Sequence, residues 1–189
     1  MQLTLPSKVK GWLNIQLTPE ELLKAYHQND DRAALARLVE LYNRDLYHYL
    51  MSLSDRELAK DVLQITWLKV MKTSELKEYH LIKSWLFRIA RNALLDEFKR
   101  SNKFDIENEL EQAIITPSLT QVIEQEDQLR LFDQALNQLN FYQKEAIIFQ
   151  QEGFSVAEIA QLTDESFETV KSRLRYGKSK LKQLLGENL

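Results

Sequence analysis

The chain of 189 residues contains no cysteine, only four glycines and three prolines, and no apolar run long enough to cross a membrane. The absence of cysteine excludes disulfide bonds, thiolate metal sites and a thiol redox sensor within this sequence. The few glycines do not form a phosphate-binding loop, and alternating strand-like runs are missing as well. We therefore expect an all-helical protein with no membrane insertion and a cytoplasmic location.

Catalytic chemistry has no evident place in this sequence. The three histidines, His27, His48 and His80, are far apart and do not follow a metal-binding spacing. The carboxylates fall mostly at positions typical of helix caps, exposed helix faces or a polar connection, rather than in acid/base pairs. We therefore expect neither an enzyme nor a bound metal or cofactor.

Two short helices joined by a polar turn are predicted near the C-terminus. Ser155 and Glu158 have the spacing of a capping box, so the first helix should begin after Ser155. Ser166 can cap the second helix, whose apolar positions recur at helical spacing. This is the pattern of a helix-turn-helix, in which the second helix enters the major groove of DNA.

The net charge of −3 conceals a segregation of charge along the chain. Residues 83–103 carry six basic and two acidic side chains, and residues 105–127 carry seven acidic and no basic ones. Residues 169–185 carry six basic and no acidic side chains. An approach to DNA phosphates requires basic helices of this kind, although a solvated basic face explains either helix taken alone.

The sequence divides into two small helical domains joined by an acidic linker. Residues 1–17 form an N-terminal extension, and a capping signal at Thr18 begins a domain that covers residues 18–100. Residues 101–125 are acidic and lack a sustained helical period, which indicates a linker. Residues 126–189 form the second domain, with four helices of which the last two are the helix-turn-helix.

One helix of the first domain, which begins at Ser84, combines an aromatic residue with a basic stripe. Such a stripe suits the stacking of an unpaired base while arginines hold the nucleic-acid backbone. A solvated basic face with a buried tryptophan explains the same residues at least as well. The stripe consists of Trp85, Arg88, Arg91, Asn92 and Lys99.

Another tryptophan, Trp67, is expected on a partly polar helix face. Asp61, Gln64 and Leu68 share this face with it. A tryptophan in such a place is either part of the core or an anchor for a partner. The residue type alone favours core packing, because large aromatic side chains are mostly buried.

Three segments carry a resemblance to a known family. Residues 61–67 read DVLQITW, residues 84–92 read SWLFRIARN, and residues 153–174 contain GFS, EIA and TVKSRL in that order. They resemble motifs of bacterial sigma factors, specifically the small two-domain extracytoplasmic-function (ECF) group. Three motifs in the right order and spacing are more specific than any one of them.

The resemblance implies a protein that binds core RNA polymerase, at its clamp and flap regions, and directs it to a two-part promoter. It also implies an anti-sigma factor as a partner. The helix of Trp67 would bind the clamp, the helix of Trp85 would capture the melted −10 strand, and the last helix would read the −35 duplex. The implied clamp contacts are Asp61, Gln64, Trp67 and Leu68; the −10 contacts are Trp85, Arg88, Arg91, Asn92, Lys99 and Arg100; the −35 contacts are Ser166, Phe167, Glu168, Thr169, Lys171, Ser172, Arg173, Arg175 and Lys178.

The turn of the helix-turn-helix departs from the family pattern. Asp164 stands where the family usually has glycine, and aspartate tolerates the left-handed conformation better than most residues. Glu165 stands where an apolar residue is usual, which predicts a loosely packed turn. Phe167 and Glu168 open the second helix, and Glu168 would repel a phosphate unless it accepts a hydrogen bond from a cytosine.

Two other classes of function are consistent with parts of the sequence. A helix-turn-helix regulator with a helical N-terminal sensor domain would bind duplex DNA without polymerase, but a sensor does not need the basic aromatic helix at residues 85–100. A helical adaptor that binds only protein would not need the charge segregation at residues 169–185.

Overall fold

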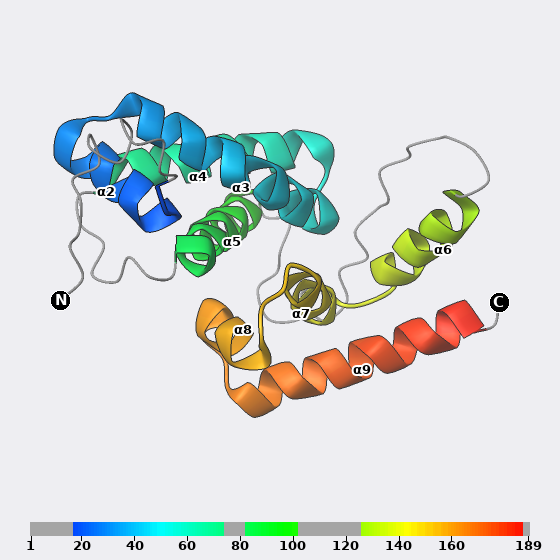
Figure 1. Cartoon of the computed structure of the whole chain (residues 1–189). Coiled ribbons are helices and arrows are strands. Elements are labelled where there is room, and N and C mark those ends of the chain that lie inside the picture. The colour runs from blue at the N-terminus through cyan, green and yellow to red at the C-terminus, as the bar shows by residue number, and fades with distance from the viewer. Residues whose placement is uncertain (1–16, 74–81, 102–125, 187–189) are drawn as a thin grey trace.

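The computed structural model describes residues 17–73, 82–101 and 126–186, which form eight α-helices and no strand (Figure 1). The prediction of an all-helical protein is confirmed. Apart from Leu17 and Ser101, the predicted N-terminal extension and acidic linker lie outside the described residues. The helices are α2 (Pro19–Asn29), α3 (Arg32–Leu53), α4 (Arg56–Lys72), α5 (Ile82–Arg100), α6 (Glu126–Asn137), α7 (Phe141–Gln151), α8 (Val156–Thr163) and α9 (Phe167–Gly186).

Short polar side chains begin several of these helices. The Thr18 hydroxyl accepts a hydrogen bond from the backbone N–H of Glu21 at 3.3 Å, and the Glu21 carboxylate accepts one from the Thr18 N–H at 3.1 Å. Ser155 and Glu158 form the same reciprocal capping box at the start of α8. Both capping boxes therefore lie where the residue spacing predicts them.

Helices α2–α5 pack together as the N-terminal domain, and α6–α9 pack together as the C-terminal domain. In the C-terminal domain, α9 packs against α6, α7 and α8. Gly177 permits this close approach, because a Cβ atom there would lie 2.7 Å from Cδ1 of Ile147 on α7. Within the described residues, no helix is both long and apolar enough to span a membrane.

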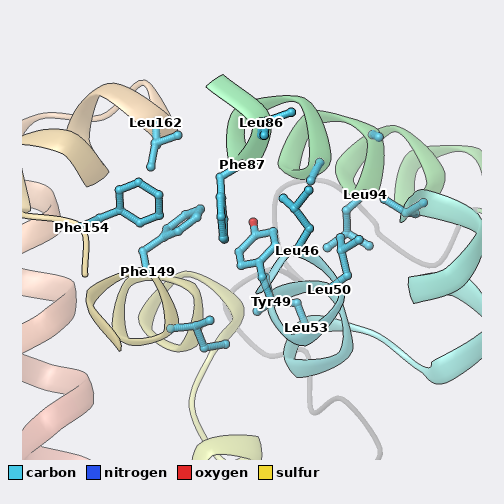
Figure 2. Close-up of a cluster of buried hydrophobic side chains, with 14 of the residues drawn as sticks. Leu46, Tyr49, Leu50, Leu53, Leu86, Phe87, Leu94, Phe149, Phe154 and Leu162 are labelled. Carbon is cyan, nitrogen blue, oxygen red and sulfur yellow. The ribbon is translucent and has the colours of Figure 1, made fainter. Parts of the chain in front are cut away.

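The two domains also pack directly against each other. Helix α3 contacts α7, and α5 contacts α8 (Figure 1). Four buried aromatic rings meet at this boundary, two from each domain (Figure 2). Tyr49 of α3 stacks on Phe149 of α7 with ring centroids 4.9 Å apart, and Phe87 of α5 meets Phe154 edge-on at 5.1 Å. The domain boundary is therefore a continuous part of the hydrophobic core.

A buried lysine opposes the stability of the C-terminal domain. Lys144 of α7 is 5% exposed, and its ammonium group donates a hydrogen bond to Oδ1 of Asn137 at 2.6 Å. Burial lowers the pKa of Lys144 to about 8, although the charge of Asp133 acts in the opposite direction. The protonated side chain therefore carries a desolvation cost that one hydrogen bond does not remove.

We expect Lys144→Met to raise the free energy of unfolding by about 1–2 kcal/mol near pH 7. The lowered pKa corresponds to a destabilisation of the folded state by roughly 3 kcal/mol, which the variant removes. The variant also loses the hydrogen bond to Asn137, which offsets about 1 kcal/mol of that gain. Urea denaturation measures the free energy of unfolding of the wild type and of the variant. An unchanged or lower free energy of unfolding in the variant would contradict the predicted cost.

The same lysine predicts a pH dependence. Between pH 8 and 10.5 the unfolded chain binds more protons than the folded one, because the folded pKa of Lys144 is about 8 and its ordinary value is 10.5. The free energy of unfolding should therefore rise with pH over this range in the wild type. The part of this rise that comes from Lys144 should be absent from Lys144→Met.

Candidate nucleic-acid interfaces

Helices α8 and α9 form the predicted helix-turn-helix. Asp164 ends α8 in the left-handed conformation, with φ 58° and ψ 42°, as expected for an aspartate in place of the usual glycine. The backbone N–H of Glu165 donates to the carbonyl of Ala160 at 3.0 Å. Ser166 then begins α9, because its hydroxyl accepts from the backbone N–H of Thr169 at 3.0 Å.

The turn between these helices is held by side chains, and the prediction of a loosely packed turn is wrong. The Glu165 carboxylate accepts a hydrogen bond from the Arg173 guanidinium at 2.7 Å. The same guanidinium lies 4.4 Å from the centroid of the Tyr142 ring on α7. Arg173 therefore connects the turn, α9 and α7, and its side chain is only 19% exposed.

The opposite sides of α9 have different surroundings. Val170, Leu174, Gly177 and Leu181 are buried against the rest of the domain. Glu168 pairs loosely with Lys171 at 3.7 Å, which offsets part of its negative charge on the outer face. The exposed side chains of that face are Phe167, Glu168, Lys171, Arg175, Tyr176 and Lys178, and Thr169 and Ser172 are half-buried.

An open groove of about 540 Å³ runs between the start of α7 and this face of α9. Its polar lining combines amide, hydroxyl and guanidinium groups. The Tyr176 side chain on its rim is 57% exposed, and the Arg175 guanidinium lies 4.7 Å from the Tyr176 ring centroid. Sequence reasoning missed Tyr176, although its position beside Arg175 on a basic helix indicates it. The groove is lined by Asn140, Tyr142, Gln143, Glu168, Thr169, Ser172, Arg173 and Tyr176.

The predicted basic stripe of α5 is divided between solvent and the other domain. Asn92, Lys99 and Arg100 are exposed, and Trp85 is half-buried. Arg88 is exposed too, but its guanidinium donates to the carbonyl of Gln161 on α8 at 2.6 Å. Lys83, just before the stripe, likewise donates to the carbonyl of Glu152.

Arg91, the central residue of the stripe, is buried at the domain boundary. Its Nε and one terminal nitrogen donate to the two carboxylate oxygens of Glu145 on α7, at 2.9 Å and 3.2 Å. The Tyr49 hydroxyl donates to the same carboxylate at 3.1 Å. Arg91 is 8% exposed and Glu145 is 1% exposed, so in this arrangement Arg91 does not lie on an open face.

Electrostatics at this buried pair favour the charged arginine. Burial acts to lower the pKa of Arg91, but the charge of Glu145 and its hydrogen bonds outweigh burial and raise that pKa. Burial, followed by the charge of Glu145, raises the pKa of Tyr49 well above its ordinary value. Tyr49 therefore stays protonated and remains a hydrogen-bond donor to the carboxylate.

Helix α4 presents the third predicted surface. Asp61, Gln64 and Leu68 are exposed on one helix face, and Leu68 is 50% exposed. Trp67 is instead 9% exposed and donates its indole N–H to Oδ1 of Asn43 at 2.9 Å, so core packing is the arrangement observed. Met71, which the apolar period of the helix would direct towards the core, is instead 39% exposed and lies three residues beyond Leu68.

Family models match both domains. A model described as "Sigma-70 region 2" matches residues 38–104, and one described as "Sigma-70, region 4" matches residues 129–181. The ECF RNA polymerase sigma factor SigM of Mycobacterium tuberculosis is 32% identical over 170 residues, which cover 88% of this chain and 84% of that protein. SigM of Bacillus subtilis is 33% identical over 67 residues, 35% of this chain and 41% of that protein.

Two solved structures are similar to this chain as well. The sigma factor RpoE, in complex with the anti-sigma factor NepR from Bartonella quintana, matches with a TM-score of 0.60 and 28% identity, over 80% of this chain and 96% of that one. CnrH, in complex with the cytosolic domain of CnrY, has the same fold, with a TM-score of 0.65 at 20% identity over 91% of this chain and 100% of that one.

The chain belongs to the ECF sigma factor family. It is a sigma factor, which binds core RNA polymerase and directs promoter-specific initiation of transcription, as the resemblance implies. Of the classes of function that the sequence left open, the regulator with a sensor domain and the protein-only adaptor are therefore not favoured.

The contact between Glu165 and Arg173 leads to a stability prediction. We expect Glu165→Ala to lower the free energy of unfolding by about 1–2 kcal/mol, because it leaves a largely buried guanidinium without its carboxylate. Glu168→Ala is the matched control, since its ion pair with Lys171 is exposed and should contribute close to nothing. Urea denaturation of both variants measures the difference, and equal losses would contradict the structural role of Glu165.

Proposed function

We propose that α9 reads the −35 element as duplex DNA in the major groove. Support comes from the sidedness of the helix, which is buried along one face and carries basic, hydroxyl and aromatic groups along the other. A helix held rigidly on one side suits base readout from the other. In this proposal Arg173 positions α9, and the DNA contacts are Ser166, Phe167, Glu168, Thr169, Lys171, Ser172, Arg175 and Lys178.

The helix α5 would capture the −10 element as a single strand. Trp85 supplies a half-buried aromatic surface near the start of the helix, and basic side chains follow it along the exposed side. Stacking on an aromatic ring together with backbone contacts from arginines is the usual chemistry of single-strand binding. The proposed contacts are Trp85, Arg88, Asn92, Lys99 and Arg100, and Arg91 would join them only when it is released from Glu145.

The exposed face of α4 would bind the clamp of core polymerase. Asp61, Gln64 and Leu68 are available on this face, and Met71 extends it. An exposed apolar pair rimmed by polar groups is typical of a protein interface. Trp67 would support this face from beneath, and the C-terminal domain would meet the flap region.

An anti-sigma factor is the proposed regulator. RpoE of Bartonella quintana, which shares 28% identity with this chain, is bound to the anti-sigma factor NepR in its crystal structure. The same kind of partner would hold this chain away from polymerase in the cytoplasm. The chain itself would contribute binding energy and positioning, and polymerase would carry out the chemistry.

Run-off transcription with core polymerase and a library of promoters tests the proposed function. We expect the protein to co-purify with the core enzyme and to direct initiation at a subset of the promoters. A protein that neither joins the core enzyme nor directs a start site, yet protects a palindrome in duplex DNA unaided, would contradict the proposal.

A reciprocal pair of variants separates the two surfaces of the N-terminal domain. Trp85→Ala should reduce promoter opening about tenfold or more and leave core binding unchanged, because one base–aromatic stack contributes roughly 1–3 kcal/mol. Leu68→Asp should weaken core binding without changing the capacity of α5 for single-stranded DNA. Permanganate reactivity of −10 thymines reports opening, and co-purification reports binding; loss of core binding in Trp85→Ala would assign α5 to the wrong surface.

A further inference from the structure

One carboxylate of the C-terminal domain accepts hydrogen bonds from two side chains of the N-terminal domain. Glu145 on α7 accepts two hydrogen bonds from Arg91 and one from Tyr49. Almost nothing of these three groups is exposed. Because a buried charge is stable only when paired and hydrogen-bonded, this geometry fixes how α7 sits against α3 and α5.

Arg91, which donates two hydrogen bonds to Glu145, belongs to the proposed −10 surface. A guanidinium binds a carboxylate and a phosphate with the same two-pronged geometry, so either group can occupy Arg91 but not both at once. Arg88, the neighbour of Arg91 on the stripe, is also engaged by the C-terminal domain, through the carbonyl of Gln161.

We propose that Glu145 takes the place of a promoter phosphate on Arg91, so that the closed arrangement of the two domains and −10 strand binding exclude each other. The free protein thereby inhibits its own binding to single-stranded DNA. This proposal rests on the assignment of α5 to the −10 strand.

The remaining contacts at the boundary also stabilise the closed arrangement. The aromatic rings of Tyr49, Phe87, Phe149 and Phe154 pack against one another there, with Tyr49 and Phe149 stacked and the other pairs edge to face (Figure 2). Opening separates these rings and returns Arg91 and Glu145 to water. A ligand that binds only the open form must offset that loss, which lowers its apparent affinity for the closed protein.

Glu145→Gln tests the proposal, because Glu145 lies outside the proposed DNA-binding and polymerase-binding surfaces. The variant should bind a fluorescent single-stranded DNA of about 12 nucleotides and mixed sequence roughly tenfold more tightly than the wild type, as the open fraction rises. Its radius of gyration in small-angle X-ray scattering should increase. Glu57→Gln is the charge-matched control, since Glu57 on α4 forms an exposed ion pair with Lys60 at 2.9 Å.

A swapped pair makes the test independent of any loss of folding in one variant. Arg91→Glu alone should open the domains, and Arg91→Glu combined with Glu145→Arg should restore the compact radius of gyration. Circular dichroism confirms that α-helix is retained. If Glu145→Gln matches Glu57→Gln in DNA affinity, or if the swapped pair is as extended as the single variant, the proposal is overturned.

The same experiment distinguishes this proposal from the proposed function. If the wild type directs run-off transcription but Glu145→Gln stays compact and binds DNA no more tightly, the proposed function stands. The proposed inhibition by Glu145 is then overturned. Domain opening in Glu145→Gln without tighter DNA binding would overturn the competition and would contradict the assignment of α5 to single-stranded DNA.

Discussion

The bidentate ion pair between Arg91 and Glu145 is the interaction on which the arrangement of the two domains depends. Each charge is buried, and each would be costly without the other. The aromatic rings around it add apolar burial, but rings alone would permit several similar packings. The ion pair requires a particular placement of α7 against α5, and it thereby decides which part of the basic stripe faces solvent.

Local signals in the sequence predicted most of the secondary structure and the surfaces carried by single helices. Capping spacings at Thr18 and Ser155, apolar periodicity and a polar turn before Ser166 depend only on neighbouring residues, so they are readable without the fold. The left-handed Asp164 was predictable for the same reason. The charged outer face of α9 follows from its helical period.

Contacts between residues far apart in the sequence were not predictable in this way. Arg91 pairs with a residue 54 positions later, and no local pattern indicates that Glu145 would be buried. The turn of the helix-turn-helix is firm because Arg173, eight residues beyond Glu165, reaches back to it and also covers Tyr142. These cases share a cause, since the sequence pattern places a charged side chain on a face towards solvent or DNA, and only the fold shows where its partner lies.

The distance between the two domains in the free protein and in the promoter complex tests this account most directly. Because the chain lacks cysteine, His48→Cys on α3 and Ala157→Cys on α8 introduce exposed, site-specific positions for a donor and an acceptor dye near the domain boundary. The account predicts high energy transfer in the free protein and low transfer once core polymerase and promoter DNA are bound. Equal transfer in both states would contradict it.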